Sequence, residues 1–138
     1  MVLDAIHFDT IIQGADLVIT GEGKVDFQTA KGKTAASVLA RAQKQHIPVI
    51  AIGGCVELCD SVMQMGFAGI YPILEEKVPL QVAMQREFAM SNVTKTIARI
   101  LKNSSILLLP SRRCYYMQAI SFCHNQITCG ICALFYHL

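Results

Sequence analysis

Three short apolar runs, each separated from the next by a helical pattern, restrict this chain to an α/β fold. The runs cover residues 15–20, 48–52 and 68–73. Each has the length and the apolar content of a strand buried on both faces of a parallel sheet. Strands that alternate with helices at this spacing form βαβ units with right-handed crossovers. We therefore predict a partial Rossmann-like, doubly wound parallel sheet of about three strands with flanking helices.

The helical segments are set by caps and apolar periodicity. Thr34 can cap a helix that runs to about Gln45. A shorter helix is predicted over residues 57–65, before Gly66. A third helical region begins at Pro79, and its apolar stripe at helical spacing consists of Val93, Ile97, Ile100 and Leu101.

The distribution of charge divides the chain near residue 103. Residues 1–103 contain all 10 Asp and Glu and 10 of the 12 Lys and Arg, so the +2 net charge comes from Arg112 and Arg113 alone. We predict a partial α/β domain over residues 1–103 and a poorly ordered, apolar, cysteine-rich tail over residues 104–138. A charge this close to balance gives no basis for nucleic-acid binding.

The tail and the first residues also bear on location. Residues 114–138 are long enough to cross a bilayer, but five polar residues argue against a span, namely Gln118, His124, Asn125, Gln126 and Thr128. Residues 1–13 lack the basic and apolar regions of a signal peptide. The 6 cysteines are therefore expected to be reduced thiols in the cytoplasm.

The segment over residues 20–33 carries most of the chemistry of this chain. It follows the first strand and precedes a helix, which is where open α/β sheets bind their ligands. Its glycines, carboxylates, hydroxyls and lysines suit an anionic substrate, a phosphate and a divalent metal. Phe27 stands where a Walker loop needs glycine, and Asp26 stands where a dinucleotide fingerprint needs its third glycine. The segment therefore belongs to neither of these two phosphate cradles.

Residues 21–29, with the sequence GEGKVDFQT, followed by Gly32 and Lys33, resemble a signature of the type I glycerate kinases. The resemblance extends over about residues 1–102. It implies a two-domain α/β enzyme that uses ATP and Mg²⁺ to phosphorylate D-glycerate, at either hydroxyl, to a phosphoglycerate. Family members are much longer than this chain. We therefore expect the C-terminal portion of such an enzyme, followed by an unrelated extension and with little or no activity alone.

The physical chemistry of phosphoryl transfer suggests catalytic roles for Asp26 and Lys33. Asp26 either ligates Mg²⁺ or accepts the proton of a glycerate hydroxyl. Lys33 holds a phosphate or the glycerate carboxylate, helped by the helix N-terminus. Glu22 is a weaker metal candidate. The residues expected to bind substrate or phosphate are Gly21, Glu22, Gly23, Gln28, Thr29 and Gly32.

Other interpretations of the sequence compete with this one. Asp26 and Thr29 could only cap turns, with the lysines as solvated charges. The chain could also be a non-catalytic protein that associates with itself or with a full-length kinase through an exposed sheet edge and the tail. A general anion-binding α/β module is a further alternative.

Overall fold

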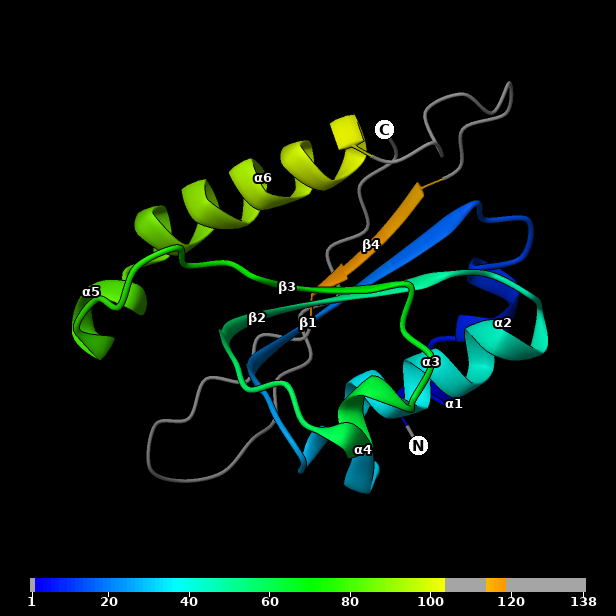
Figure 1. The fold of residues 1–138 in the computed structure, drawn as a ribbon. Coiled ribbons are helices and arrows are strands. Elements are labelled where there is room, and N and C mark those ends of the chain that lie inside the picture. The colour runs from blue at the N-terminus through cyan, green and yellow to red at the C-terminus, as the bar shows by residue number, and fades with distance from the viewer. Residues whose placement is uncertain (1, 104–113, 119–138) are drawn as a thin grey trace.

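The computed structural model describes residues 2–103 and 114–118, and its centre is a parallel sheet. The sheet has four strands in the order β3-β2-β1-β4, with helices on both faces (Figure 1). The strands are β1 (Leu17–Val25), β2 (Val49–Val56), β3 (Gly69–Pro72) and β4 (Cys114–Gln118). The predicted doubly wound parallel architecture is confirmed.

The helices fall into two groups. One face of the sheet is covered by the helices that come before or between the first three strands, and the opposite face is covered by α6 (Figure 1). The first group comprises α1 (Val2–Ala5), α2 (Phe8–Ile11), α3 (Thr34–Lys44) and α4 (Asp60–Met63). A 3-10 turn, η1 (Thr29–Lys31), precedes α3, while α5 (Leu80–Ala83) precedes α6 (Arg86–Asn103).

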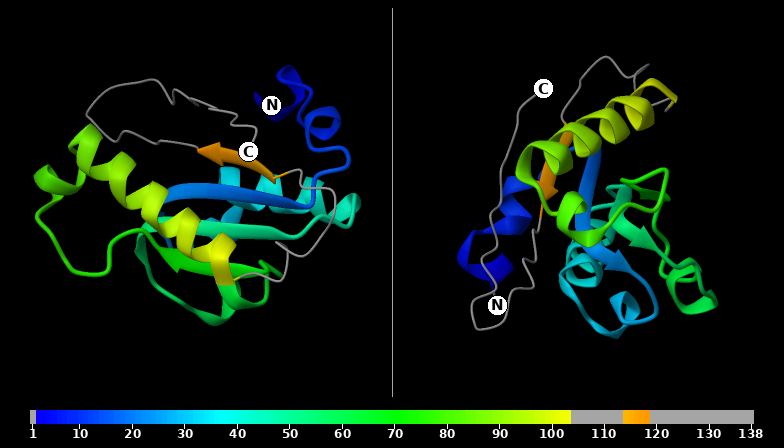
Figure 2. Two further views of the ribbon diagram at one scale, coloured as in Figure 1. Left: turned by 90° about the horizontal axis from the view of Figure 1, so that it is seen from above. Right: turned by 90° about the vertical axis from the view of Figure 1, so that its left-hand side faces the viewer.

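Alternate residues of β1 supply two separate cores. Val18 packs with buried residues of α2 and α3, such as Phe8 and Val38. Leu17 and Ile19 point to the opposite face and pack with buried residues of β2 and α6. Figure 2 shows helices on opposite sides of one layer of strands, and one core lies on each side, which is the arrangement that a strand apolar on both faces requires.

The predicted apolar stripe of α6 is confirmed. Val93 and Ile100 are buried on the sheet, and Ile97 and Leu101 are partly buried against the same core. These residues are buried together because positions three, four and seven apart share one face of a helix. None of the helices in the described ranges has the length and hydropathy needed to cross a bilayer.

The predicted ends of the first two strands are wrong. β1 does not end at Thr20 but continues to Val25, and β2 continues past Ile52 to Val56. The glycines that indicated turns lie within these two paired strands instead. The strands approach closely there, because a Cβ on Gly54 would stand 2.9 Å from the carbonyl oxygen of Gly23. Glycine at this position permits two backbones to approach closely rather than to turn.

A short ribbon results from these longer strands. β3 pairs with β2 only as far as Gly53, and β4 pairs with β1 only as far as Gly21. Beyond that level, within the described residues, β1 and β2 pair only with each other, ending at Val25 opposite Val56. We call this segment, residues 22–25 and 54–56, the central ribbon.

β4 was not predicted, because the tail has no period of two. It pairs in parallel with the first part of β1, so the part of β1 that is buried on both faces has a neighbour on each side. The tail cysteines Cys123, Cys129 and Cys132 lie outside the described residues, and the predicted poor order of the tail stays a prediction.

Candidate active site at the carboxyl end of the central strands

Asp26 follows the central ribbon directly and is only 4% exposed. Its Oδ1 accepts a hydrogen bond from the backbone N–H of Gln28 at 2.9 Å, and its Oδ2 lies 3.4 Å from the ammonium of Lys24. A carboxylate that follows a buried strand and turns back on its own loop in this way forms an Asx turn. The site is thus built into the end of β1.

The charge of Asp26 is stabilised by its surroundings. Burial acts to raise the pKa of Asp26, but the Gln28 N–H, the Lys24 ammonium and the charge of Lys33 outweigh it, so that the net pKa is lowered. Asp26 is therefore an anion at neutral pH. An anion with a low pKa is a weak base but a good ligand for a hard cation and a good hydrogen-bond acceptor.

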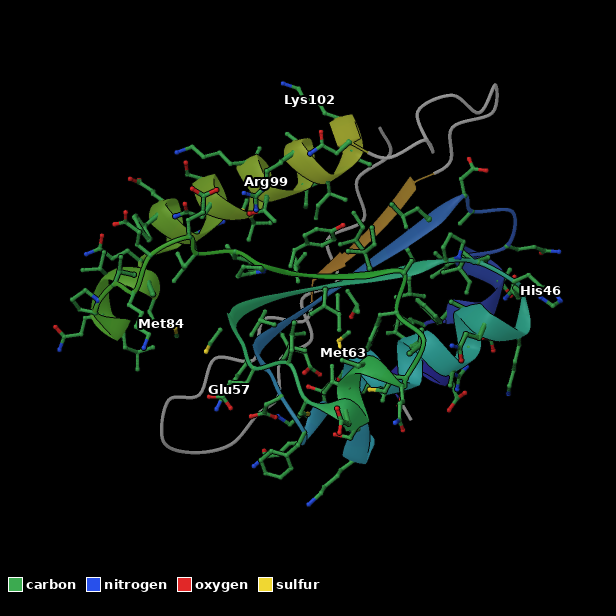
Figure 3. All side chains as sticks on the ribbon, in the orientation of Figure 1. His46, Glu57, Met63, Met84, Arg99 and Lys102 are labelled. Carbon is green, nitrogen blue, oxygen red and sulfur yellow. The ribbon has the colours of Figure 1, made fainter. Side chains whose placement is uncertain are left out.

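Lys24 and Glu57 extend this charged group, although neither is among the site residues predicted from the sequence. The ammonium of Lys24 lies 3.0 Å from Oε1 of Glu57, and this hydrogen bond is the main reason why the pKa of Lys24 is raised. Glu57 directly follows β2 and donates its N–H to the Val25 carbonyl at 2.8 Å. Its side chain lies beyond the ends of the central strands (Figure 3). Only the strand register, which places Lys24 opposite Cys55, could have revealed this pairing.

Glu22 joins the ribbon to α3. Its Oε2 accepts the hydroxyl of Thr29 at 2.8 Å, and its Oε1 accepts the backbone N–H of Ala35 at 3.3 Å. The N-cap position of α3 is Lys33, which makes no side-chain cap. The prediction that Thr34 caps this helix is therefore wrong, because Thr34 is already the first helical residue and the capping carboxylate comes from β1.

The other predicted site residues take up different positions. Gly21 is buried in the ladder, where a Cβ would make ordinary contact with Ile52 at 3.5 Å. Gly23 borders open space, which leaves its backbone accessible to a ligand. Gly32 has φ +95°, a left-handed conformation that glycine adopts without strain. Lys33 is exposed at the start of α3.

The structure therefore brings half of the predicted residues together. Glu22, Asp26 and Thr29 are connected by hydrogen bonds, and Gln28 contributes its backbone N–H. No direct contact connects Lys33 to this network, although its charge acts on Asp26. No group of three or more His, Cys, Asp or Glu side chains suited to a metal occurs within the described ranges.

A separate hollow in the described part of the chain lies elsewhere. It has a volume of about 420 Å³ and is bordered by the segment after β3 and by α6. Two of its charged residues, Arg99 and Glu75, pair with each other at 2.5 Å. The Asp26 network lies outside this hollow, with Asp26 and Thr29 buried and with Gln28 and Lys33 exposed beside them.

Comparison with known proteins gives a single family. The profile of the Glycerate kinase family matches residues 1–104. A glycerate kinase of Bacillus cereus is 42% identical over 107 residues, and one of Bacillus subtilis is 37% identical over 111 residues. These alignments cover 76% and 79% of this chain.

A solved structure agrees with the sequence relatives. A Salmonella typhimurium LT2 protein assigned as glycerate kinase 2 matches with a TM-score of 0.50 and 31% identity over 73% of this chain. The match covers 26% of the Salmonella chain, and the Bacillus matches cover 28% and 29% of those proteins. This chain thus spans less than a third of the length of these relatives. By sequence and by fold, the chain belongs to the glycerate kinase family.

Proposed function

We propose that this chain forms one wall of the active site of an ATP-dependent glycerate kinase. The observation that carries the proposal is the buried Asp26 carboxylate at the carboxyl end of the central parallel strands. It is held ionised by Gln28, Lys24 and Lys33, in the segment that resembles the family signature. Open α/β sheets bind ligands at this edge.

Phosphoryl transfer depends on positioning and on neutralising charge more than on a strong base. Mg²⁺ in such sites is usually held by one or two carboxylates together with substrate phosphates and water, so Asp26 alone is a sufficient protein ligand on this wall. Bound there, the metal would neutralise charge on the transferring phosphate. Alternatively, Asp26 orients the glycerate hydroxyl by accepting a hydrogen bond from it, and then accepts its proton during the transfer.

Lys33 and the exposed backbone near it are proposed to bind the anionic groups. Lys33 is solvent-exposed beside the Asp26 loop, so its ammonium can reach a phosphate or the glycerate carboxylate. Gly23 has room above its Cα, and Gln28 presents an exposed amide side chain to a substrate hydroxyl. These groups share one edge of the sheet, as one substrate requires. A cytoplasmic location is part of the same proposal.

A chimera provides the direct test. The matched segment of the Bacillus cereus glycerate kinase would be replaced by residues 1–103 of this chain, and ATP-dependent phosphorylation of D-glycerate would be measured by a coupled assay. We expect an active chimera, while the isolated 138-residue chain has little or no activity because most of the substrate cage is missing. An inactive but folded chimera would contradict the proposal.

Asp26→Asn in the chimera separates the two roles of the carboxylate. We expect kcat to fall by about 100-fold or more, a size typical of a lost charge-stabilising group. If Asp26 ligates Mg²⁺, the Mg²⁺ concentration needed for half-maximal rate rises as well; if it orients the hydroxyl, that concentration is unchanged. Glu87→Gln, which alters an exposed carboxylate in the first turn of α6, is the matched control.

A second candidate function is protein binding at the same end of the molecule. Phe27, Leu58 and Met63 are 50%, 60% and 61% exposed, and they lie beside η1 and α4, which contact each other. Large exposed apolar side chains in neighbouring segments favour a protein partner. Light scattering after size-exclusion chromatography, on the chain alone and mixed with full-length kinase, tests this. A monomer that does not bind the kinase would exclude it.

A further inference from the structure

Glu22 has an arrangement that its predicted role as a ligand does not require. It lies in the central ribbon, opposite Gly53 of β2. Both of its carboxylate oxygens accept hydrogen bonds from later parts of the chain, one from Thr29 and one from Ala35. The carboxylate therefore faces inward to the turn η1 and the start of α3.

Thr29 connects Glu22 to Asp26 through hydrogen bonds. Its side chain is fully buried, and its Oγ1 accepts the backbone N–H of Asp26 at 3.2 Å. An ionised carboxylate can only accept hydrogen bonds, whereas a hydroxyl has one proton to donate. Glu22 thus fixes the direction of the chain of hydrogen bonds: Asp26 N–H donates to Thr29, and Thr29 donates to Glu22.

The same carboxylate occupies the N-terminus of α3. The first N–H groups of a helix have no partner within the helix, and here Ala35 donates one of them to Glu22. The negative charge also complements the positive end of the helix dipole. One N–H group at this helix end is therefore already paired within the chain.

We propose that Glu22 is a positioning residue, which fixes the Asp26 loop and the start of α3 in one arrangement and does not bind the metal. Its effect on the reaction rests on the proposed function, whereas its effect on the loop does not. Removing the carboxylate takes away the acceptor of the Thr29 hydroxyl, so that the oxygen of Thr29 is no longer held in place to accept the Asp26 N–H.

The first experiment uses the whole chain and requires no activity. Amide hydrogen exchange would be measured for wild type, Glu22→Gln, Thr29→Val and Thr29→Ser. We expect at least 10-fold faster exchange at the Asp26 amide in Glu22→Gln and Thr29→Val, with near wild-type rates in Thr29→Ser, which keeps the hydroxyl. Ala35 should exchange faster in Glu22→Gln.

Two comparisons make this experiment decisive. The amide of Ile50, in the apolar core, reports global stability, and it should be unchanged where the effect is local. Glu57→Gln changes another carboxylate at the same end of the sheet and should leave the Ala35 amide unaffected. Unchanged exchange at both Asp26 and Ala35 in Glu22→Gln would overturn the proposal.

The second experiment uses the active chimera. Glu22→Gln and Thr29→Val should each lower kcat by about 10-fold, and the double variant should be no worse than either, because both changes break one chain of contacts. The Mg²⁺ concentration for half-maximal rate should stay at its wild-type value; a rise in Glu22→Gln alone would make Glu22 a metal ligand and overturn the proposal. An inactive chimera would count against the proposed function and leave the exchange result standing.

Discussion

The first and second halves of β1 and β2 belong to the same two strands but differ in almost every property. In the first halves, residues such as Leu17 and Ile50 are buried in a core. The second halves contain glycines, extend beyond β3 and β4, and end at ionised side chains. Stability and chemistry are therefore separated along the length of the strands, and not between different elements.

The glycines in the second halves of the two strands have two different roles. Gly53 and Gly54 have no room for a Cβ, because Cγ2 of Val25 and the carbonyl oxygen of Gly23, both on β1, would each lie 2.9 Å away. Gly23, on the neighbouring strand, borders open space. One set of glycines permits the two strands to pair closely, and the other leaves a surface that a ligand can approach.

The largest expected effect comes from the core of the first halves. Leu17→Ala removes a side chain with no exposed surface and should lower the free energy of unfolding by about 2–5 kcal/mol. Urea denaturation followed by circular dichroism measures it. Cys55→Ala, at an exposed position in the second half of β2, should have a free energy of unfolding within about 0.5 kcal/mol of wild type. Equal losses of stability in both variants would contradict the difference between the two halves.

Gly54→Ala tests the close pairing of the ribbon. The added methyl group meets the Gly23 carbonyl oxygen at 2.9 Å, so we expect a loss of about 1–3 kcal/mol. The matched variant is Gly23→Ala, which has open space at its Cβ and should be close to neutral in urea denaturation. In the chimera, however, Gly23→Ala should raise a substrate KM. A destabilised Gly23→Ala variant would show that both glycines serve packing.

The pH dependence of stability tests the charge of Asp26. Folding lowers the pKa of this group from its ordinary value of 3.8, so the unfolded chain binds the proton more readily than the folded chain does. Its stabilising contribution is therefore present above about pH 4 and is lost as the pH falls further. The stability difference between wild type and Asp26→Asn should shrink between about pH 5 and pH 2, and a difference that grew on acidification would contradict the lowered pKa.

The smallest effect is expected at the surface of the site. Lys24 is 45% exposed and its partner Glu57 is 61% exposed, so solvent screens their pairing. Lys24→Met should leave the free energy of unfolding close to that of wild type, and high salt should remove most of any change. In the chimera the same variant should alter activity more than stability, because it removes a cation beside Asp26.

The sequence was sufficient for features that depend on neighbouring residues. Strand runs, the α6 stripe from Val93 to Leu101 and the signature around Asp26 all follow from local periodicity or spacing. Features that depend on pairing were missed. The continuation of β1 beyond Thr20 depends on β2, and the cap from Glu22 spans 13 positions to Ala35.

The same reasoning explains Glu57 and β4. Glu57 comes within 3.0 Å of Lys24 only because two strands run side by side past their neighbours. β4 has no alternating pattern, and its position beside β1 is a long-range pairing. Sequence patterns report which residues an element buries, but they carry little information about which elements meet.

The hydrogen bond from Ala35 to Glu22 also has an entropic consequence. It closes a ring of backbone across 13 positions, and this ring contains Asp26, Gln28 and Lys33. A loop tied at both ends has fewer conformations to lose when a substrate arrives. The bridge therefore restricts the loop before any ligand is present, and under the proposed function less of the interaction energy with an anion is spent on ordering the loop.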